Sequence, residues 1–334
     1  MTGPDLRHHG DIDALPGLVD LAVNVRADGP PAWLAQRLAG VDLSRYPSQD
    51  AAVKAVAARH GRSPSDVLLT AGAAEALVLV ARALKPRHPV VIHPQFTEAE
   101  LALQAAGHSV HRVVLAPPFT LDTRFVPDDA DLVVLGNPTN PTSVLHDRAT
   151  ILALRRPGRV IVVDEAFADC DPGEPQSLAG DPDFVVVRSL TKTWGIAGVR
   201  AGYVLGSSAL IERLRTAQPH WPLNALAVEA CVACSSPRAV AESTAWAHAQ
   251  ALRRDHLTAL LARLPGVEVV PNPRASFVLV QTPVPQVWSA LRGKGFAVRR
   301  GDSFPGLGPH WIRVAVRDEA TSVSFTKALQ EVLS

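Results

Sequence analysis

RVIVVDEAF at residues 159–167 and DFVVVRSLTK at residues 183–192 are the two stretches that decide the fold prediction. Each is a continuous run of mainly β-branched residues that ends in polar ones, which is typical of a strand covered on both faces. PVVIH at 89–93 and DLVVLG at 131–136 are further runs of this kind, and helical stretches separate them. The alternation predicts an α/β fold with a mostly parallel sheet between helices. RAGYVLG at 200–206 predicts one more strand, which could run antiparallel.

The pattern changes after a long helical stretch from about residue 236 to 264. The segments VEVV, SFVLVQ, a helix near 284–293, FAVRR, WIRVAVR and a final helix follow, and they predict a smaller α+β unit with an antiparallel sheet. A chain of 334 residues is also long for a single core. We therefore expect a large domain over residues 46–245, with residues 1–45 and 246–334 forming an N-terminal arm and a small domain.

Composition argues against several classes of protein. The net charge of +1 provides no strong field for nucleic acid or an anionic membrane. No apolar run is long enough to span a bilayer, and the first residues, MTGPDLRHHGD, lack the apolar core of a signal peptide, so we expect a cytoplasmic protein. Cys170, Cys231 and Cys234 do not make a disulfide framework, and we interpret the last two as helix packing rather than a metal site.

Lys192 is the first candidate for chemistry. It follows the end of an apolar run together with Ser189 and Thr191, and Arg200 comes eight residues later. Desolvation at a strand end would lower the pKa of the lysine and make it a nucleophile toward an aldehyde. The hydroxyls and the arginine suit a phosphate dianion. The alternative interpretation is an ordinary surface lysine.

Three other segments are predicted to end at the same edge of the sheet. Asp164 follows a buried run and needs a cationic partner, such as a protonated pyridine nitrogen, unless it caps a helix. GNPTNPT at 136–142 offers asparagine side chains, although it could be a simple turn. AGAAE at 71–75 opens a helix whose free N–H groups can bind phosphate, and it lacks the glycine spacing of a nicotinamide site.

Taken in order, and with HPQF at 93–96, these motifs resemble the class I/II aminotransferase family. The similarity is greatest to the branch that holds histidinol-phosphate aminotransferases and the threonine-phosphate decarboxylases of cobalamin synthesis, and it covers nearly the whole chain. The resemblance implies the pyridoxal-phosphate fold type I and a homodimer. It also implies that pyridoxal 5'-phosphate forms a Schiff base with Lys192 and that Asp164 pairs with the pyridine nitrogen.

The resemblance implies further site residues. Asn140 would donate to the ring hydroxyl oxygen, and Phe96 would stack on the ring. The implied phosphate contacts are the amides of Ala73 and Ala74, the side chains of Ser189, Thr191 and Arg200, and Tyr46 reaching across to the neighbouring subunit. The implied substrate contacts are Asn24, Arg299, Arg313 and His9.

Two departures from the family pattern bear on the reaction. Phe167 stands where many members have a tyrosine, and with SFPGLG at 303–308 it favours the decarboxylase branch, whereas His9 replaces a glycine typical of that branch. The way Arg299 and Arg313 hold the substrate decides which bond breaks. We predict transamination, with decarboxylation as the alternative and an inactive regulatory module as a third possibility.

The expected substrate is a small amino compound bearing a phosphate group. Two arginines, Arg299 and Arg313, would repel each other in one pocket unless an anionic ligand lay between them. The alternative is that one of them pairs with a protein carboxylate such as Asp302.

Overall fold

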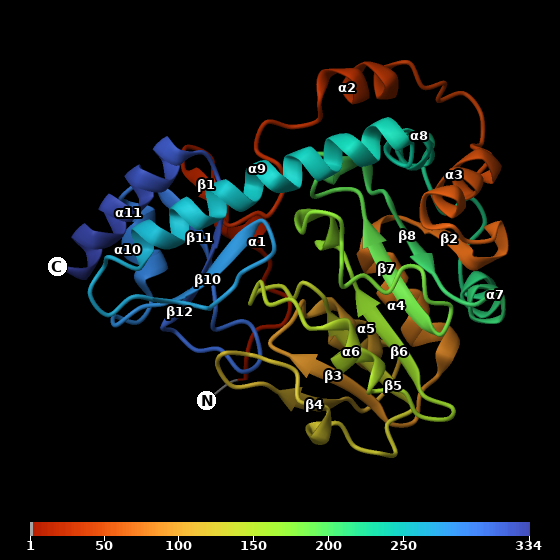
Figure 1. The fold of residues 1–334 in the computed structure, drawn as a ribbon, viewed down its shortest axis with the longest axis horizontal. Coiled ribbons are helices and arrows are strands. Elements are labelled where there is room, and N and C mark those ends of the chain that lie inside the picture. Colours follow the sequence, from red (N-terminus) through yellow and green to blue (C-terminus); the bar gives the residue numbers. More distant parts are fainter. Residues whose placement is uncertain (1–2) are drawn as a thin grey trace.

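The computed structural model describes residues 3–334, which form two β-sheets and the helices around them (Figure 1). The larger sheet has seven strands in the order β2-β8-β7-β6-β5-β3-β4. Its strands are β2 (Val67–Thr70), β3 (Pro89–His93), β4 (His111–Val114), β5 (Leu132–Gly136), β6 (Val160–Asp164), β7 (Phe184–Ser189) and β8 (Gly202–Leu205). All neighbours pair parallel except at β8, which runs antiparallel to β2 and β7. The predicted α/β fold and its strands are confirmed.

Helices cover both faces of this sheet, so successive residues of a central strand enter different parts of the core. In β6, Val162 packs in the cluster that includes α4, α5 and α7, and Val163 packs in the cluster that includes α3 and α8. Burial on both faces explains the unbroken apolar runs in the sequence. The helices are α3 (Asp50–His60), α4 (Gly72–Leu84), α5 (Glu98–Ala105), α6 (Arg148–Leu152), α7 (Ser208–Thr216) and α8 (Ala225–Cys234).

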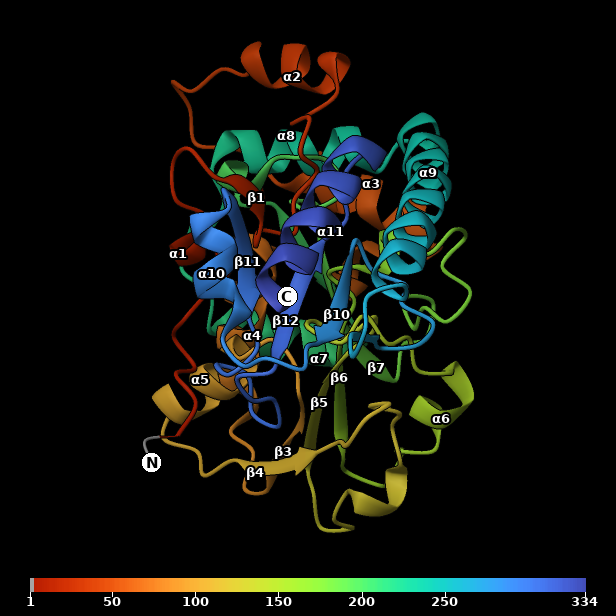
Figure 2. The same ribbon diagram turned by 90° about the vertical axis from the view of Figure 1, so that its left-hand side faces the viewer.

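The second sheet has five strands in the order β1-β11-β12-β10-β9, and it lies beside α10 and α11 (Figure 2). The strands are β1 (Val19–Leu21), β9 (Glu268–Val269), β10 (Phe277–Gln281), β11 (Phe296–Arg300) and β12 (Trp311–Ala315). The helices of this part are α1 (Gly10–Asp13), α10 (Val287–Gly293) and α11 (Glu319–Leu333), whereas α2 (Ala32–Ala39) packs against α8. The prediction of an antiparallel sheet holds for β9 to β12, but β1 from the N-terminal arm joins the edge parallel to β11.

Helix α9 (Pro237–Leu261) joins the two parts of the chain, contacting α8 at one end and α11 at the other (Figure 1). This helix runs through residue 245, at which the large domain was predicted to end, so the domain limits stay a prediction. Within residues 3–334, none of the helices combines the length and apolar character needed to cross a membrane. The three cysteines are free and buried, which for Cys231 and Cys234 agrees with their interpretation as packing residues of a helix. Among the described residues, four short 3-10 helices complete the fold: Pro64–Asp66, Thr123–Phe125, Ala168–Cys170 and Ala197–Val199.

Candidate active site

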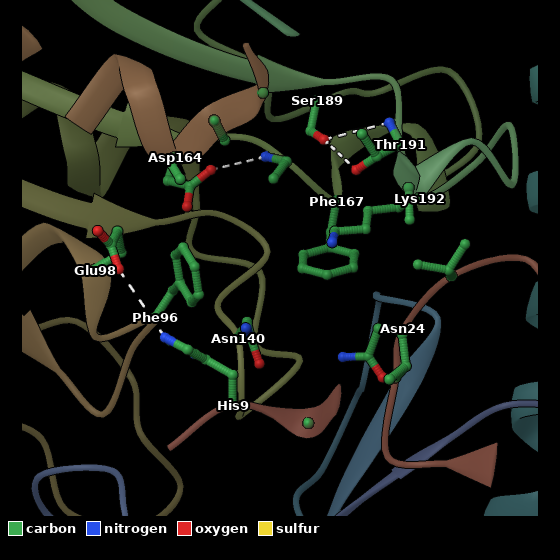
Figure 3. A pocket seen from close by; sticks show the side chains of 18 of the residues that line it. His9, Asn24, Phe96, Glu98, Asn140, Asp164, Phe167, Ser189, Thr191 and Lys192 are labelled. Carbon is green, nitrogen blue, oxygen red and sulfur yellow. Dashed lines mark hydrogen bonds and ion pairs between the residues drawn. The ribbon is translucent and has the colours of Figure 1, made fainter. Parts of the chain in front are cut away.

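A cavity of about 560 Å³ lies where the carboxyl ends of β5, β6 and β7 face β11 and β12 of the second sheet. Parallel strands present such an edge to ligands in open α/β sheets. The cavity is lined by every residue that the sequence assigned to the site except Tyr46 (Figure 3): His9, Asn24, Ala73, Ala74, Phe96, Asn140, Asp164, Ser189, Thr191, Lys192, Arg200, Arg299 and Arg313. The tertiary structure therefore brings together residues that are spread over most of the chain.

Asp164 is the last residue of β6, and it lines the cavity at the carboxyl end of that strand. Its carboxylate accepts a hydrogen bond from the backbone N–H of Ala166 at 3.0 Å, and it forms no ion pair with any residue in the range 3–334. Burial raises the pKa of Asp164 to about 6, although that hydrogen bond and the charge of Lys192 act in the opposite direction. No α-helix begins at Asp164, so the helix-cap interpretation is wrong. The site instead offers a buried carboxylate that needs a cation.

Lys192 lies in the same cavity, which excludes the interpretation as an ordinary surface lysine. Desolvation lowers the pKa of its amine to about 8, and the positive charges of Arg200 and Arg313 lower it further, whereas Asp164 acts in the opposite direction. An amine with such a pKa is neutral in about one molecule in ten at pH 7, a far larger share than for an ordinary lysine. Lys192 is therefore suited both to attack an aldehyde and to carry a proton.

The amino-terminal end of α4 forms a seat for an anion. Its first turn has backbone N–H groups with no partner inside the helix, at Gly72, Ala73 and Ala74. Gly72 has a φ of +79°, and a Cβ atom there would lie 2.8 Å from Nη2 of Arg200. The hydroxyls of Ser189 and Thr191 are 2.8 Å apart beside it. Backbone amides, two hydroxyls and a guanidinium together suit a phosphate group.

Arg313 and Arg299 enter the cavity from the second sheet, where β12 and β11 place them opposite each other. Arg313 donates to Oδ1 of Asn140 at 2.5 Å and to the carbonyl oxygen of Ala22. One of the two amide orientations of Asn24 places its oxygen 3.0 Å from Nη1 of Arg313. Burial and the charge of Arg299 lower the pKa of Arg313 well below its usual range. Among the described residues Arg313 has no carboxylate partner, so an anionic ligand would stabilise it.

The comparison with known proteins decides the family. The family model described as aminotransferase class I and II matches residues 16–329. This chain belongs to that family.

Three known proteins are similar to this chain over most of its length. A histidinol-phosphate aminotransferase of Mycobacterium tuberculosis is 53% identical over 94% of this chain and 87% of its own. A threonine-phosphate decarboxylase of Salmonella typhimurium is 30% identical over 95% of this chain and 92% of its own. The structure of a histidinol-phosphate aminotransferase of Sinorhizobium meliloti in complex with pyridoxal-5'-phosphate has a TM-score of 0.81, at 22% identity, covering 93% of this chain and 89% of that one. The predicted family and fold type are confirmed.

The alternative that one of the two cavity arginines pairs with a protein carboxylate is correct for Arg299, but the carboxylate is Asp13 and not Asp302. Asp302 binds Arg300, with distances of 2.5 and 2.7 Å between the guanidinium nitrogens and the carboxylate oxygens. Nη1 of Arg299 instead lies 3.9 Å from Oδ2 of Asp13, and Nη2 donates to the carbonyl oxygen of His8 at 2.5 Å. No motif along the chain indicates Asp13, because its approach to Arg299 depends on how the N-terminal arm folds back.

His9, from the N-terminal arm, lines the cavity next to Phe96. Its ring lies 5.7 Å from that of Phe96, and its Nε2 is 4.0 Å from a carboxylate oxygen of Glu98 (Figure 3). Burial and the charge of Arg299 lower the pKa of His9, while Glu98 opposes that change. Sequence reasoning missed Glu98, although it stands only two residues after Phe96.

Phe167 also lines the cavity, so the departure noted in the sequence is located at the site. Its ring meets that of Phe277 edge-on at 4.9 Å. Phenylalanine offers no hydroxyl to a ligand, and its surroundings are apolar. The cavity therefore lacks, at this position, the hydrogen-bond donor that many family members have.

Tyr46 lies outside the cavity and is 75% exposed. Its ring stacks on that of Trp221 at 4.4 Å, and Trp221 is itself 61% exposed. The contact of Tyr46 with a neighbouring subunit stays a prediction.

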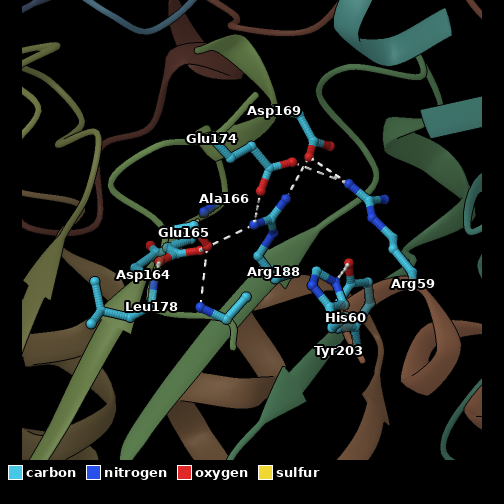
Figure 4. Close-up of polar contacts among 12 residues, drawn as sticks. Arg59, His60, Asp164, Glu165, Ala166, Asp169, Glu174, Leu178, Arg188 and Tyr203 are labelled. Carbon is cyan, nitrogen blue, oxygen red and sulfur yellow. Dashed lines mark hydrogen bonds and ion pairs between the residues drawn. The ribbon is translucent and has the colours of Figure 1, made fainter. Parts of the chain in front are cut away.

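A buried network of charges connects the ends of β6 and β7 (Figure 4). Glu165 follows Asp164 and points the other way, where it pairs with Arg188 at 3.0 Å. Arg188 also pairs with Asp169 and Glu174, each at 2.5 Å. These pairs link the end of β6 to the end of β7, and so hold Asp164 in register with the segment that leads to Lys192.

Proposed function

We propose that this chain is a pyridoxal-phosphate-dependent aminotransferase that acts on histidinol phosphate. The observation that carries the proposal is one cavity that holds Lys192 and Asp164 on one side and Arg299 and Arg313 on the other. The first pair suits a cofactor with an aldehyde and a pyridine ring, and the second suits an anionic substrate. The 53% identity to the Mycobacterium tuberculosis histidinol-phosphate aminotransferase supports the same substrate here.

The residues of the cavity fit pyridoxal phosphate. Asp164 is a buried carboxylate without a cationic partner in residues 3–334, and a protonated pyridine nitrogen would serve as that partner. Arg200, Ser189, Thr191 and the first amides of α4 would hold the phosphate group. When bound, the cofactor supplies an electron sink for the bond that breaks at the amine-bearing carbon.

The chain's own residues would then perform binding and proton transfer. The amine of Lys192 would attach the cofactor covalently and later, once released, accept and return a proton at its Nζ. Asp164 would remain ionised beside the pyridine nitrogen, because a cationic partner lowers the pKa of a buried carboxyl group. Phe96 and His9 would cover the ring and exclude water, and Arg313 would orient the substrate anion with Asn24.

Product analysis tests this proposal directly. The purified protein with its cofactor is incubated with histidinol phosphate and 2-oxoglutarate, and formation of glutamate is measured. In parallel, release of carbon dioxide from threonine phosphate alone is measured. Glutamate formation that needs both substrates supports the proposal, and its absence contradicts it.

Threonine-phosphate decarboxylation is the second candidate. It is favoured by Phe167, which offers no hydroxyl in the cavity, and by the 30% identity to the Salmonella typhimurium decarboxylase. Carbon dioxide release without any 2-oxoglutarate would replace the aminotransferase proposal with this one.

We further propose that the enzyme is a homodimer in the cytoplasm. The exposed, stacked rings of Tyr46 and Trp221 support the dimer, because exposed aromatic pairs are frequent at contacts between subunits.

A further inference from the structure

Ser143 has a strained backbone at the end of the loop that carries Asn140. Its φ is +63°, in the left-handed region that favours glycine, and its side chain is fully buried. The loop follows β5 as a tight turn. The backbone N–H of Ser143 donates to the carbonyl oxygen of Thr139 at 2.7 Å, and that of Thr139 donates to the carbonyl oxygen of Val144 at 2.8 Å. A residue other than glycine keeps such a conformation only where other contacts hold it there.

The hydroxyl of Ser143 accepts two hydrogen bonds from a distant part of the chain. Its Oγ lies 3.0 Å from the backbone nitrogen of Arg274 and 2.8 Å from that of Ala275. The N–H of Arg274 also donates to the carbonyl oxygen of Ser143 at 2.8 Å. Glycine would adopt this φ without strain but would lack both hydroxyl contacts. The hydroxyl is therefore the physical reason for a serine at this position.

Arg274 and Ala275 lead directly into β10 of the second sheet. Nη1 of Arg254, from α9, donates to the carbonyl oxygens of these two residues, each at 3.1 Å. Side chains from the loop and from α9 thus hold all four backbone polar groups of this short segment. Within the sheet, Leu279 of β10 pairs with Arg313 of β12. Fixing the start of β10 therefore also fixes the position of Arg313 relative to the loop.

The same loop contacts Arg313 at a second point. Oδ1 of Asn140, three residues before Ser143, accepts a hydrogen bond from Nη1 of Arg313. Asn140 lines the cavity (Figure 3), and its amide nitrogen has no acceptor within residues 3–334. That nitrogen is free to donate to a ligand. Ser143 itself lies outside the cavity lining, so any effect it has on a ligand passes through Asn140.

We propose that Ser143 is a positioning residue, which holds the amide of Asn140 between Arg313 and the cofactor ring by tying the loop to the start of β10. The inference rests on the proposed function, in which the cavity binds pyridoxal phosphate. Donation from an amide N–H stabilises negative charge on the ring oxygen. The position of Asn140 therefore influences the pH at which the visible absorbance of the cofactor-loaded protein titrates.

Ser143→Gly tests the hydroxyl, because glycine relieves the backbone strain and removes only the side-chain contacts. The visible absorbance of the cofactor-loaded protein is titrated with pH in the absence of substrate. We expect the midpoint to rise by about 0.5 pH or more, since weaker donation leaves the ring oxygen a stronger base. Hydrogen exchange of the cofactor-free protein, followed by mass spectrometry, should be roughly tenfold faster in peptides that contain Arg274 and Ala275.

Further variants separate positioning from stability. Ser143→Ala removes the same hydroxyl but keeps the strain, so it should move the midpoint in the same direction. Ser236→Ala is the matched control, because Oγ of Ser236 accepts from the backbone N–H of Ala239 at 3.3 Å at the start of α9, outside the cavity lining. It should lower stability and leave the midpoint unchanged. Ser143→Cys keeps a weak acceptor, should show a smaller rise, and provides the test if the glycine variant is unstable.

A midpoint within about 0.2 pH of wild type in both Ser143→Gly and Ser143→Ala would overturn the proposal, even if hydrogen exchange became faster, because Ser143 would then be structural only. The titration uses no substrate, so its result does not depend on whether the enzyme transaminates or decarboxylates. If the wild-type protein binds the cofactor but forms no glutamate from histidinol phosphate, the proposed function fails and the midpoint still decides the role of Ser143. Failure of the wild-type protein to bind pyridoxal phosphate would overturn both.

Discussion

Arg313 donates a hydrogen bond from Nη1 to Oδ1 of Asn140 at 2.5 Å. Arg313 belongs to β12 of the small sheet, and Asn140 belongs to the turn after β5 of the large sheet. The bond therefore joins the side of the cavity assigned to the substrate to the side assigned to the cofactor. A ligand that binds Arg313 changes the surroundings of Asn140 as well.

Arg313→Ala should lower kcat/KM for the phosphorylated substrate by about 100-fold or more, since it removes a buried guanidinium from an anion. Arg313→Lys should recover only a part, because a lysine cannot reproduce the planar fork that also reaches Asn140 and Ala22. Steady-state kinetics measure both effects. Arg300→Ala is the control, as this neighbouring arginine pairs with Asp302 outside the cavity lining, and equal losses in both variants would refute the assignment.

Lys192→Ala should abolish turnover and leave the fold intact. Borohydride reduction of the wild-type protein should fix the cofactor on the peptide that contains Lys192, because this lysine is the one in the cavity. Mass spectrometry of the digested protein locates the label. Lys327→Ala, at an exposed position in α11, should keep full activity and labelling. Label on any lysine other than Lys192 would show that the site is misassigned.

Asp164→Asn should make the cofactor-free protein more stable than wild type at pH 8. In the cofactor-loaded enzyme the same substitution should lower activity by about 100-fold or more. The folded-state pKa of Asp164 is raised to about 6 from 3.8, so its burial favours the protonated form. The stabilisation of wild type by this proton is complete below pH 3.8 and is lost as the pH rises through 6. The advantage of the variant should thus be on the order of 3 kcal/mol at pH 8 and vanish near pH 3.5. Urea unfolding across this pH range measures it, and a difference that does not depend on pH would contradict the buried carboxylate.

Arg188→Met should lower the free energy of unfolding by about 3–5 kcal/mol, because it leaves three buried or partly buried carboxylates without their shared guanidinium (Figure 4). Chemical denaturation measures the change. Arg215→Met is the control, since its pair with Glu212 is exposed and should contribute under about 1 kcal/mol. Equal costs in the two variants would mean that the network adds nothing beyond an exposed pair.

Tyr46→Ala should weaken cofactor retention without altering the fold of the subunit, if its ring reaches the phosphate seat of a neighbouring subunit. Light scattering after size exclusion gives the oligomeric state, and equilibrium dialysis gives the dissociation constant of the cofactor. Phe125→Ala, which removes another exposed aromatic ring, is the control. A fully active monomer of the wild-type chain would exclude this role for Tyr46.

Much of the site could be predicted because its residues sit in short motifs fixed by local structure. Asp164 ends a strand, Lys192 follows one, and Ala73 and Ala74 begin a helix, so an alternating α/β pattern already places them at one edge of the sheet. Asp13 and Glu98 could not be predicted in this way. Their approach to the cavity depends on how the N-terminal arm and α5 pack, which no local pattern encodes.

The sequence by itself determined the α/β fold, the family and the set of residues around Lys192, because apolar periodicity and short motifs depend on neighbours along the chain. The tertiary structure decided the charges that these residues experience. It left Asp164 without an ion pair among the described residues, placed Asp13 beside Arg299, and paired Asp302 with Arg300 instead. The pairing of Asp13 with Arg299 joins residues hundreds of positions apart, and burial sets its strength, so it exists only once the chain has folded.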